Sequence, residues 1–474
     1  MQERTSTLRT GNHLVPPASG LRLMRIYSLC VLMAAAALSA PAEEFPLEFK
    51  TLKPEEVQTF PGAFFTVGRL KSVKPKGLKS EPKTACRQPF YGVLDEGSSN
   101  SFIFRVEESE DGSGYDRLLI DLNQNGDLTD DPVVQGTFKS VTNLSLPNSQ
   151  FTTFWPIPVA PQRMIGSWRP VYLGELRVDT RDAGKGEDVY IGLLRVYAAW
   201  YLETTVQLDG FKRRVAVFDT AAQMRLGNEW KLNARAGWYF DPGDSFLQDL
   251  DGSGRFERHP EGGGISAFGP LQYFGPRPYK VSLAPDRRSL RVERWTGPLA
   301  EVAVRPHGDQ VRNLELAWEK SRGQWQLLDP PVLDGKFTVP PGDYRLSGCN
   351  VVATPAQGQP VMAGAFQQNI RKTVRFTAGR LNTFRCGPPL QVEVSAEKRK
   401  PQDWELQRKL VTPADPNVDS EFVLAIHGQI QGADQETYLA FRRGKDLKQE
   451  PPKPAFAVLD ANGKPAGSGN LEYG

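Results

Sequence analysis

The chain has 474 residues, and its 58 lysines and arginines nearly balance its 55 aspartates and glutamates, for a formal net charge of +3. A charge this close to zero gives no electrostatic basis for binding nucleic acid or an anionic membrane surface, so we expect no nucleic-acid partner. The length suits a folded protein of roughly two to four domains.

The first 42 residues have the features of an export signal. Arg22 and Arg25 precede an apolar run at residues 26–38, and Ala40-Pro-Ala42 matches the small-x-small pattern of a cleavage site. The run is shorter than the roughly 20 residues of a membrane span, and no later segment is apolar enough to be one. We therefore predict a leader over 1–42 with an over-extended start before Met24, a periplasmic or extracellular location, and no stable membrane insertion.

The remaining sequence favours strands. Segments 102–106, 189–196 and 215–218 are short, rich in β-branched or aromatic residues, and bounded by turn residues, whereas long helical periodicity is nearly absent. We predict a mostly β fold. An N-terminal β domain over 43–292 would be followed by two β-sandwich domains, over 293–392 and 393–474.

One stretch of the first domain, residues 121–131, alternates oxygen-bearing side chains with others. Ca²⁺ takes 6–8 oxygen ligands, and a short loop supplies several of them when alternate side chains turn inward. Gly126 stands where such a loop makes its sharp turn. The candidate ligands are Asp121, Asn123, Asn125, Asp127, Asp130 and Asp131.

This first loop resembles the calcium loop of EF-hands and dockerins, D-x-[DN]-x-[DN]-G. The resemblance implies side-chain ligands at positions one, three and five, a backbone carbonyl from Asp127 at seven, and an apolar residue at eight, which is Leu128. Position twelve departs from the pattern, because Pro132 replaces the bidentate glutamate, so Asp130 and Asp131 would close the shell instead. The flanking segments lack helical spacing, and we predict strand–loop–strand with a structural ion rather than a sensor.

A second loop, residues 249–257, repeats the pattern, with Gly254 at the turn, Phe256 at position eight and Pro260 at position twelve. Its candidate ligands are Asp249, Asp251, Ser253, Arg255 and Glu257. A weaker relative of the pattern begins at Asp219, but it lacks the chelating residues and predicts no independent site. Asp219, Asp241 or Asp244 could still lend an oxygen to the second loop. The alternative for both loops is an ordinary Asp/Asn/Gly turn, since these residues dominate turns without any metal.

Downstream, residues 337–346 read Phe-Thr-Val-Pro-Pro-Gly-Asp-Tyr-Arg-Leu. They resemble the VPPGxYxL hairpin of transthyretin-like and carboxypeptidase-regulatory-like sandwiches, which implies a fold and no activity. The segment 393–474 is expected to be an Ig-like sandwich, with an Asn-Gly hairpin turn at 460–464. If the chain is exported, Cys349 and Cys386 could join in a disulfide, leaving Cys86 as the odd cysteine.

Catalytic signatures are missing from the sequence: it has no C-x-x-C, G-x-S-x-G, phosphate-binding glycine loop or H-E-x-x-H. His259 is the best single candidate for a catalytic base, although a structural histidine is the commoner case. A carboxylate pair for glycoside hydrolysis would show only in three dimensions.

As a whole the chain resembles uncharacterised exported bacterial proteins that combine EF-hand- or dockerin-like calcium loops with Ig-like and carboxypeptidase-regulatory-like sandwiches. The loops and the Val-Pro-Pro-Gly segment carry this resemblance. We expect an exported, calcium-binding, non-enzymatic protein that binds or scaffolds a protein or glycan at the cell exterior. The alternative is an exported hydrolase acting on polysaccharide or ester, with calcium as a structural ion.

Overall fold

The computed structural model describes residues 42–83, 88–94, 101–108, 114–139, 149–159, 164–179, 191–220, 222, 226–227, 230–232, 240–241, 243–257, 264–322, 324–354, 358–366, 372–400, 423–444, 447 and 449–470. The predicted leader (apart from Ala42), Cys86 and His259 lie outside these residues. The fold is mostly β, as predicted, with a short helix α2 (Pro54–Val57) and a 3₁₀ turn η2 (Gly308–Gln310). No helix in this described part of the chain has the length and apolar character of a membrane span.

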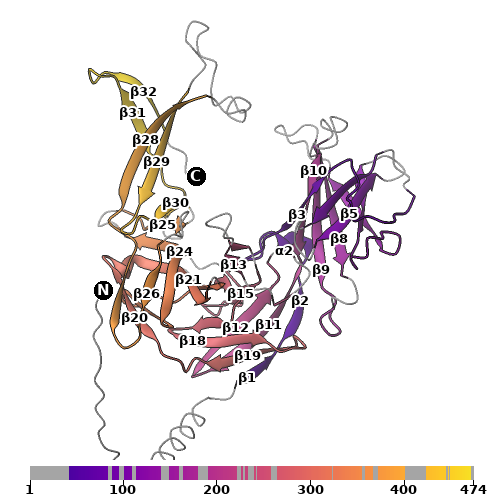
Figure 1. Ribbon diagram of the computed structural model, residues 1–474, viewed down its shortest axis with the longest axis horizontal. Coiled ribbons are helices and arrows are strands. Elements are labelled where there is room, and N and C mark those ends of the chain that lie inside the picture. Colours follow the sequence, from indigo (N-terminus) through magenta and orange to yellow (C-terminus); the bar gives the residue numbers. More distant parts are fainter. Residues whose placement is uncertain are drawn as a thin grey trace, which may run out of the picture. The chain divides into compact units, whose positions relative to one another are not determined.

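Eight strands of the predicted first domain close into a barrel, coloured from indigo to magenta in Figure 1, in the order β10-β3-β4-β5-β6-β7-β8-β9. Their bounds are β3 (Thr66–Leu70), β4 (Phe90–Leu94), β5 (Phe102–Glu108), β6 (Tyr115–Ile120), β7 (Val133–Lys139), β8 (Ser149–Pro158), β9 (Val171–Asp179) and β10 (Gly192–Ala198). Side chains fill the interior, as an eight-stranded barrel permits. The ring of Phe104 occupies the space left by Gly68 and Gly92, where a Cβ would come within 2.3 Å of it.

Two further sheets complete the segment up to residue 294. The five-stranded sheet has the order β16-β15-β12-β11-β2, and the four-stranded sheet the order β1-β19-β18-β17. The bounds are β1 (Glu43–Pro46), β2 (Glu48–Thr51), β11 (Trp200–Leu208), β12 (Phe211–Phe218), β15 (Ser245–Gln248), β16 (Ile265–Ala267), β17 (Leu271–Phe274), β18 (Arg277–Leu283) and β19 (Ser289–Arg294), with a small pair β13 (Lys231–Leu232) and β14 (Phe240–Asp241). β18 and β19 pair as an antiparallel hairpin at the end of this segment.

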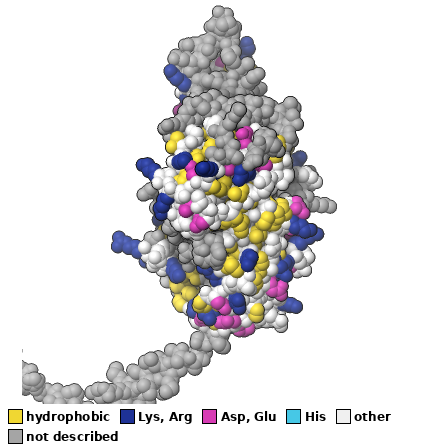
Figure 2. Space-filling view, turned by 90° about the vertical axis from the view of Figure 1, so that its right-hand side faces the viewer, with side chains coloured by type: hydrophobic (Ala, Val, Ile, Leu, Met, Phe, Trp, Pro, Cys, Tyr) yellow, Lys and Arg dark blue, Asp and Glu magenta, His cyan; other side chains and the backbone are white. Residues whose placement is uncertain are grey.

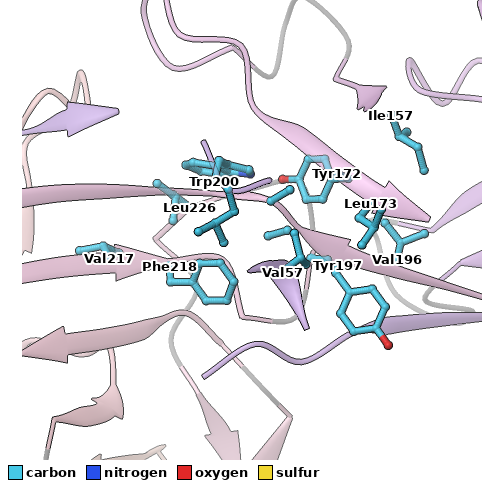
Figure 3. Packing of buried hydrophobic residues seen from close by; sticks show 14 of the residues in the cluster. Val57, Ile157, Tyr172, Leu173, Val196, Tyr197, Trp200, Val217, Phe218 and Leu226 are labelled. Carbon is cyan, nitrogen blue, oxygen red and sulfur yellow. The ribbon is translucent and has the colours of Figure 1, made fainter. Parts of the chain in front are cut away.

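One apolar core joins the barrel to these sheets. Tyr172 of β9 lies beside Trp200 of β11, with Phe218 of β12 close by, as Figure 3 shows, and all three are almost fully buried. The phenol of Tyr172 donates a hydrogen bond to Asp219 Oδ2 (2.8 Å), which satisfies a carboxylate buried in this core. The predicted N-terminal domain is therefore one packed body built from a barrel and flanking sheets.

The segment after residue 299 forms two facing sheets around a second core. The three-stranded sheet is β23-β20-β27, and the larger sheet is β22-β21-β24-β25-β30-β29-β28, with β26 on β24. The bounds are β20 (Ala300–Arg305), β21 (Val311–Ser321), β22 (Gln324–Leu328), β23 (Lys336–Val339), β24 (Gly342–Ala353), β25 (Val361–Phe366), β26 (Val374–Phe376), β27 (Leu381–Arg385), β28 (Gln391–Arg399), β29 (Val423–Gln431) and β30 (Thr437–Arg443). The hairpin β31 (Ala455–Leu459) and β32 (Pro465–Asn470) follows, joined by the predicted Asn-Gly turn.

Two details differ from the sequence predictions. The Val-Pro-Pro-Gly segment is not a hairpin, because β23 belongs to the three-stranded sheet and β24 to the larger one. Pro340 and Pro341 lack the N–H that a ladder needs, and the Tyr344 hydroxyl donates to Pro340 O (2.5 Å), so the chain crosses between sheets there. The segment after 393 does not form a separate sandwich, since β30 pairs with β25 and extends the sheet of the preceding segment.

Surface charge is mixed on the face that Figure 2 shows, where lysine and arginine side chains are spread among acidic and apolar ones. This pattern agrees with the formal net charge of +3 and forms no single-sign stripe on that face.

The close packing of Phe104 against glycine generates a stability test. Gly68→Ala places a Cβ 2.3 Å from the Phe104 ring and should cost about 1–3 kcal/mol of stability through overpacking. Adding Phe104→Leu should recover part of that loss in chemical denaturation. Gly467→Ala is the control, because Gly467 of β32 has open space around its missing Cβ. Equal melting temperatures for all variants would contradict the packed interior.

Candidate calcium loops

The first loop joins β6 to β7, which pair antiparallel, so the predicted strand–loop–strand arrangement is present. The backbone N–H of Asp121 donates to Ile103 O of β5 (2.9 Å), which anchors the start of the loop to the barrel wall. Asp121 is only 3% exposed. Its carboxylate points into the loop, where Oδ1 accepts the N–H of Asn125 (3.0 Å) and Oδ2 accepts the N–H of Gly126 (2.8 Å).

The alternate side chains of the first loop turn inward as the pattern predicts. Asn123 Oδ1 accepts the N–H of Asn125 (3.0 Å), and Asn125 Oδ1 accepts the N–H of Asp127 (2.7 Å). Asp127 Oδ1 accepts the N–H of Thr129 (2.8 Å). Gly126 has a φ of +81°, a conformation that favours glycine. Five hydrogen bonds from backbone N–H groups thus direct five oxygens of four side chains toward one loop interior.

Asp130 and Asp131 close the first loop. Asp130 Oδ2 accepts from the side-chain amides of Asn123 (3.1 Å) and Asn125 (2.9 Å), and Asp131 Oδ1 accepts the N–H of Leu122 (3.2 Å). The second oxygen, Asp131 Oδ2, is buried and has no hydrogen-bond donor among the described residues. Burial, with the nearby charges of Asp121, Asp130 and Asp127, raises the pKa of Asp131 to about 6. The loop therefore concentrates negative charge that a cation would relieve.

A distant segment clamps the first loop. Ser80 forms a β-bridge with Asp127, Leu128 N donates to Ser80 O (3.0 Å), and Lys79 N donates to Gly126 O (2.7 Å). The Lys79 ammonium donates to Asn125 O (2.7 Å). Sequence reasoning missed this segment, because no local pattern links it to a loop so far along the chain.

The second loop joins β15 to β16 and repeats three of the hydrogen bonds of the first. Asp249 Oδ2 accepts the N–H of Gly254 (2.9 Å), five residues on, as Asp121 does from Gly126. Asp251 Oδ1 accepts the N–H of Ser253 (3.0 Å), and Ser253 Oγ accepts the N–H of Arg255 (3.3 Å). Gly254 has a φ of +79°. The same ladder therefore forms at two separate places in the chain.

Asp249 is 6% exposed, and its Oδ1 is buried with no donor in the part of the chain that the structure describes. Its own N–H donates to Arg214 O of β12 (3.0 Å), which anchors the loop start as Ile103 anchors the first loop. The Arg214 guanidinium donates to Gly254 O (2.5 Å) and stacks over the buried Phe256 ring at 4.4 Å. Glu257 remains exposed, so the second loop is more open at its far end.

Neither Asp219 nor Asp244 reaches the second loop. In the β12–β15 ladder, Phe218 faces Ser245 at one end, whereas Val215 faces Gln248 at the other, next to Asp249. The two aspartates therefore lie at the opposite end of the ladder. Asp219 accepts from Tyr172, and Asp244 Oδ2 accepts the N–H of Gly227 (2.6 Å).

The donor sets of both loops fit a hard cation. Among the described residues, no three His, Cys, Asp or Glu side chains converge into a ready group for a metal. Calcium loops of this kind, however, draw on amide and carbonyl oxygens as well as carboxylates. All the predicted donors are oxygens, and each loop has one buried carboxylate oxygen, Asp131 Oδ2 or Asp249 Oδ1, that lacks a donor. The pattern assigns position seven to the backbone carbonyls of Asp127 and Arg255. The Lys79 and Arg214 side chains donate to other carbonyls, those of Asn125 and Gly254.

Two surface cavities bear on the hydrolase alternative. One, of about 280 Å³, is lined by Arg213, Arg312 and Asp329, and the other, of about 260 Å³, by Glu175, Arg177 and Arg195. Among the residues that the structure describes, each is lined by a single carboxylate beside arginines, whereas glycoside hydrolysis needs a carboxylate pair. Comparison with known protein families, curated proteins and solved structures finds no match for the chain.

The two turn glycines give a matched prediction. Both adopt positive φ, so replacement by alanine should cost about 1–2 kcal/mol at either position. At Gly126 the new Cβ would also lie 2.5 Å from Gly77 O, whereas at Gly254 nothing lies within 4 Å. Gly126→Ala should therefore lower the melting temperature more than Gly254→Ala. Equal losses of melting temperature would show that the segment around Lys79 and Ser80 does not clamp the first loop.

The substitution Asp131→Asn removes the charge of this side chain while keeping its shape nearly unchanged. Asparagine keeps the acceptor for Leu122 N and replaces the unpartnered carboxylate oxygen by an amide. Because the pKa of Asp131 in the folded chain is about 6, above its unfolded value, its ionised form destabilises the fold at neutral pH. Without calcium, the variant should be more stable by about 1 kcal/mol at pH 7.5, after allowance for solvent screening. The gain should vanish near pH 4, where wild-type Asp131 is protonated.

The same variant should respond less to calcium, since it loses a carboxylate at the candidate site. Thermal melts at both pH values, with EDTA or with calcium, provide the measurement. A variant that matches wild type in all four conditions would contradict the role assigned to Asp131.

Proposed function

We propose that the chain is an exported, calcium-stabilised β protein that binds or scaffolds a partner and is not an enzyme. One observation supports the calcium sites above all: the loops after β6 and β15 form the same hydrogen-bond ladder, from the first carboxylate to the turn glycine. An ordinary turn needs no such repeat, and no buried carboxylate oxygen left without a donor.

The proposed ions are structural. At the first loop, a cation would offset the repulsion that raises the pKa of Asp131 and would tie the β6–β7 connection to the clamp at Ser80. At the second, it would stabilise the link between β15 and β16, whose Asp249 already anchors to β12. Affinity is expected on the order of 10⁻⁴–10⁻³ M, as for extracellular calcium modules. Such weak sites suit a calcium-rich exterior, in line with the predicted leader.

The proposed partner is a protein or glycan at the cell exterior. Support for a binding role comes from the architecture of several β-sheets and from two cavities that, among the described residues, are each lined by one carboxylate. No specific observation favours the hydrolase alternative.

A calcium titration of the full chain tests the proposal. After removal of metal with EDTA, calorimetry should detect binding in the 10⁻⁴–10⁻³ M range, and 10 mM calcium should raise the melting temperature by several degrees, because roughly 1.5–3 kcal/mol of linkage is expected. Magnesium at equal concentration controls for ionic strength and should have a smaller effect, since it demands a stricter octahedral geometry.

Matched variants assign the sites. Asp121→Ala and Asp249→Ala together should abolish the calcium response. Asp460→Ala is the control, because Asp460 Oδ1 accepts the N–H groups of Asn462 (2.9 Å) and Lys464 (2.8 Å) in the β31–β32 turn without being part of either loop. Absence of binding up to several millimolar, or a response that survives in the double variant, would overturn the proposal.

A further inference from the structure

Two cysteines meet in the core of the second sandwich. Cys349 lies on β24 of the larger sheet, opposite Leu314 of β21. Cys386 directly follows β27 of the three-stranded sheet, and its N–H donates to Arg305 O (3.3 Å). Both are free thiols, 3% and 0% exposed, so the structure does not contain the disulfide considered from the sequence.

The two thiols are direct neighbours. The neighbouring Cys349 side chain, together with burial, raises the pKa of the Cys386 thiol well above its usual value. Backbone geometry supports the approach independently. A Cβ built on Gly387 would lie 3.6 Å from side-chain atoms of both Val311 and Val351, so the chain after β27 packs onto β21 and β24 at this level.

A buried polar cluster covers the thiol pair. The Tyr438 hydroxyl lies 3.6 Å from Cys349 Sγ and donates to Glu436 Oε1 (3.2 Å). That oxygen also accepts the N–H of Gly387 (2.6 Å), and Oε2 accepts the N–H of Asp434 (2.8 Å). The carboxylate is thus engaged at both oxygens, and it holds β30 and the 386–387 turn together over the cysteines.

We propose that Cys349 and Cys386 form a disulfide site that links the two sheets of the sandwich, closed by exchange with a disulfide-bearing oxidant while the chain folds. The thiolate of one cysteine attacks the oxidant's disulfide and releases one oxidant thiol. The thiolate of the second cysteine then attacks the mixed disulfide and releases the other. The protein gives up two electrons and two protons, and the oxidant disulfide becomes two thiols. This inference does not rest on calcium binding.

Burial sets the timing of the reaction. Thiolates carry out the exchange, and a solvent-borne oxidant must reach them. In the folded chain both sulfurs are inaccessible, and Cys386 is held protonated by its environment. Oxidation therefore precedes the docking of β30, whose Tyr438 covers the pair. A chain that folds under reducing conditions remains a trapped dithiol, and a chain that folds beside an oxidant acquires the link.

The test uses the full chain with Cys30→Ser and Cys86→Ser, which leaves the pair as the only two of its four cysteines. It is refolded either with oxidised glutathione or with a reductant. With oxidant, the intact mass should fall by about 2 Da relative to the reduced form, through loss of two hydrogens. Trypsin should then yield one cross-linked species joining residues 346–371 and 386–398.

Stability and reactivity provide second readouts. The oxidised form should melt several degrees higher, because the link restrains the unfolded chain. The chain folded in reductant should react with a thiol reagent only after denaturant is added. Cys349→Ala is the control and should show neither the mass change nor the stability gain.

Three outcomes would overturn the inference: two free thiols after oxidative refolding, a stable glutathione adduct at one cysteine, or rapid conversion of the folded dithiol by oxidised glutathione. Stoichiometric zinc retained by the dithiol form would also overturn it, by showing the pair to be a metal site.

Discussion

The inward-pointing carboxylates of Asp121 and Asp249 are the constraint on which both candidate sites depend. Each accepts the N–H of a glycine five residues on, and that bond draws the loop into a closed turn. Once closed, the loop holds its remaining oxygens on the inside, next to a carboxylate oxygen without a donor. The hydrogen bonds that stabilise the turn therefore also bring its negative charges together, so folding of this short segment would be coupled to the proposed cation binding.

The barrel and its neighbouring sheets explain why these loops keep their shape. Asp121 starts from a bond to β5 and Asp249 from a bond to β12, so each loop begins at a strand that the core holds in place. Basic side chains then hold the loop carbonyls from outside, Lys79 on the first loop and Arg214 on the second. A rigid frame lowers the ordering cost of ligand binding, which is how weak oxygen sites retain useful affinity.

Predictions from the sequence succeeded where contacts are local. Most side chains of 121–131 and 249–257 that accept backbone N–H groups do so from residues two to five positions away. Such spacing is visible in the sequence as alternating Asp, Asn and Ser with glycine at the turn. The strands beside the first loop were also predicted. The clamp at Lys79 and Ser80 was not, because its contacts span almost fifty residues.

Long-range pairing caused the differences in the second half as well. The Pro-Pro-Gly step predicted a turn, yet which sheet accepts β24 depends on partners such as Cys349 opposite Leu314, and no local pattern encodes that register. The join of β30 to β25 likewise places Tyr438 in a core whose other members lie far earlier in the chain. A boundary drawn by composition at 393 could not anticipate a strand that returns after an intervening hairpin to cover an open sheet edge.

The two proposed sites, the calcium loops and the cysteine pair, have one physical feature in common. In each, the fold brings together groups that it leaves uncompensated: carboxylates that repel one another around Asp131, and the buried neighbouring thiols of Cys349 and Cys386. Each is completed by something from the surroundings, a divalent cation or a disulfide oxidant, and each completion would cross-link strand ends that sequence-local bonds do not join. Both reagents are abundant outside the cytoplasm and scarce within it. The predicted leader at 1–42 is thus the sequence feature on which both proposals depend, since export would bring the chain into contact with calcium and with a disulfide oxidant.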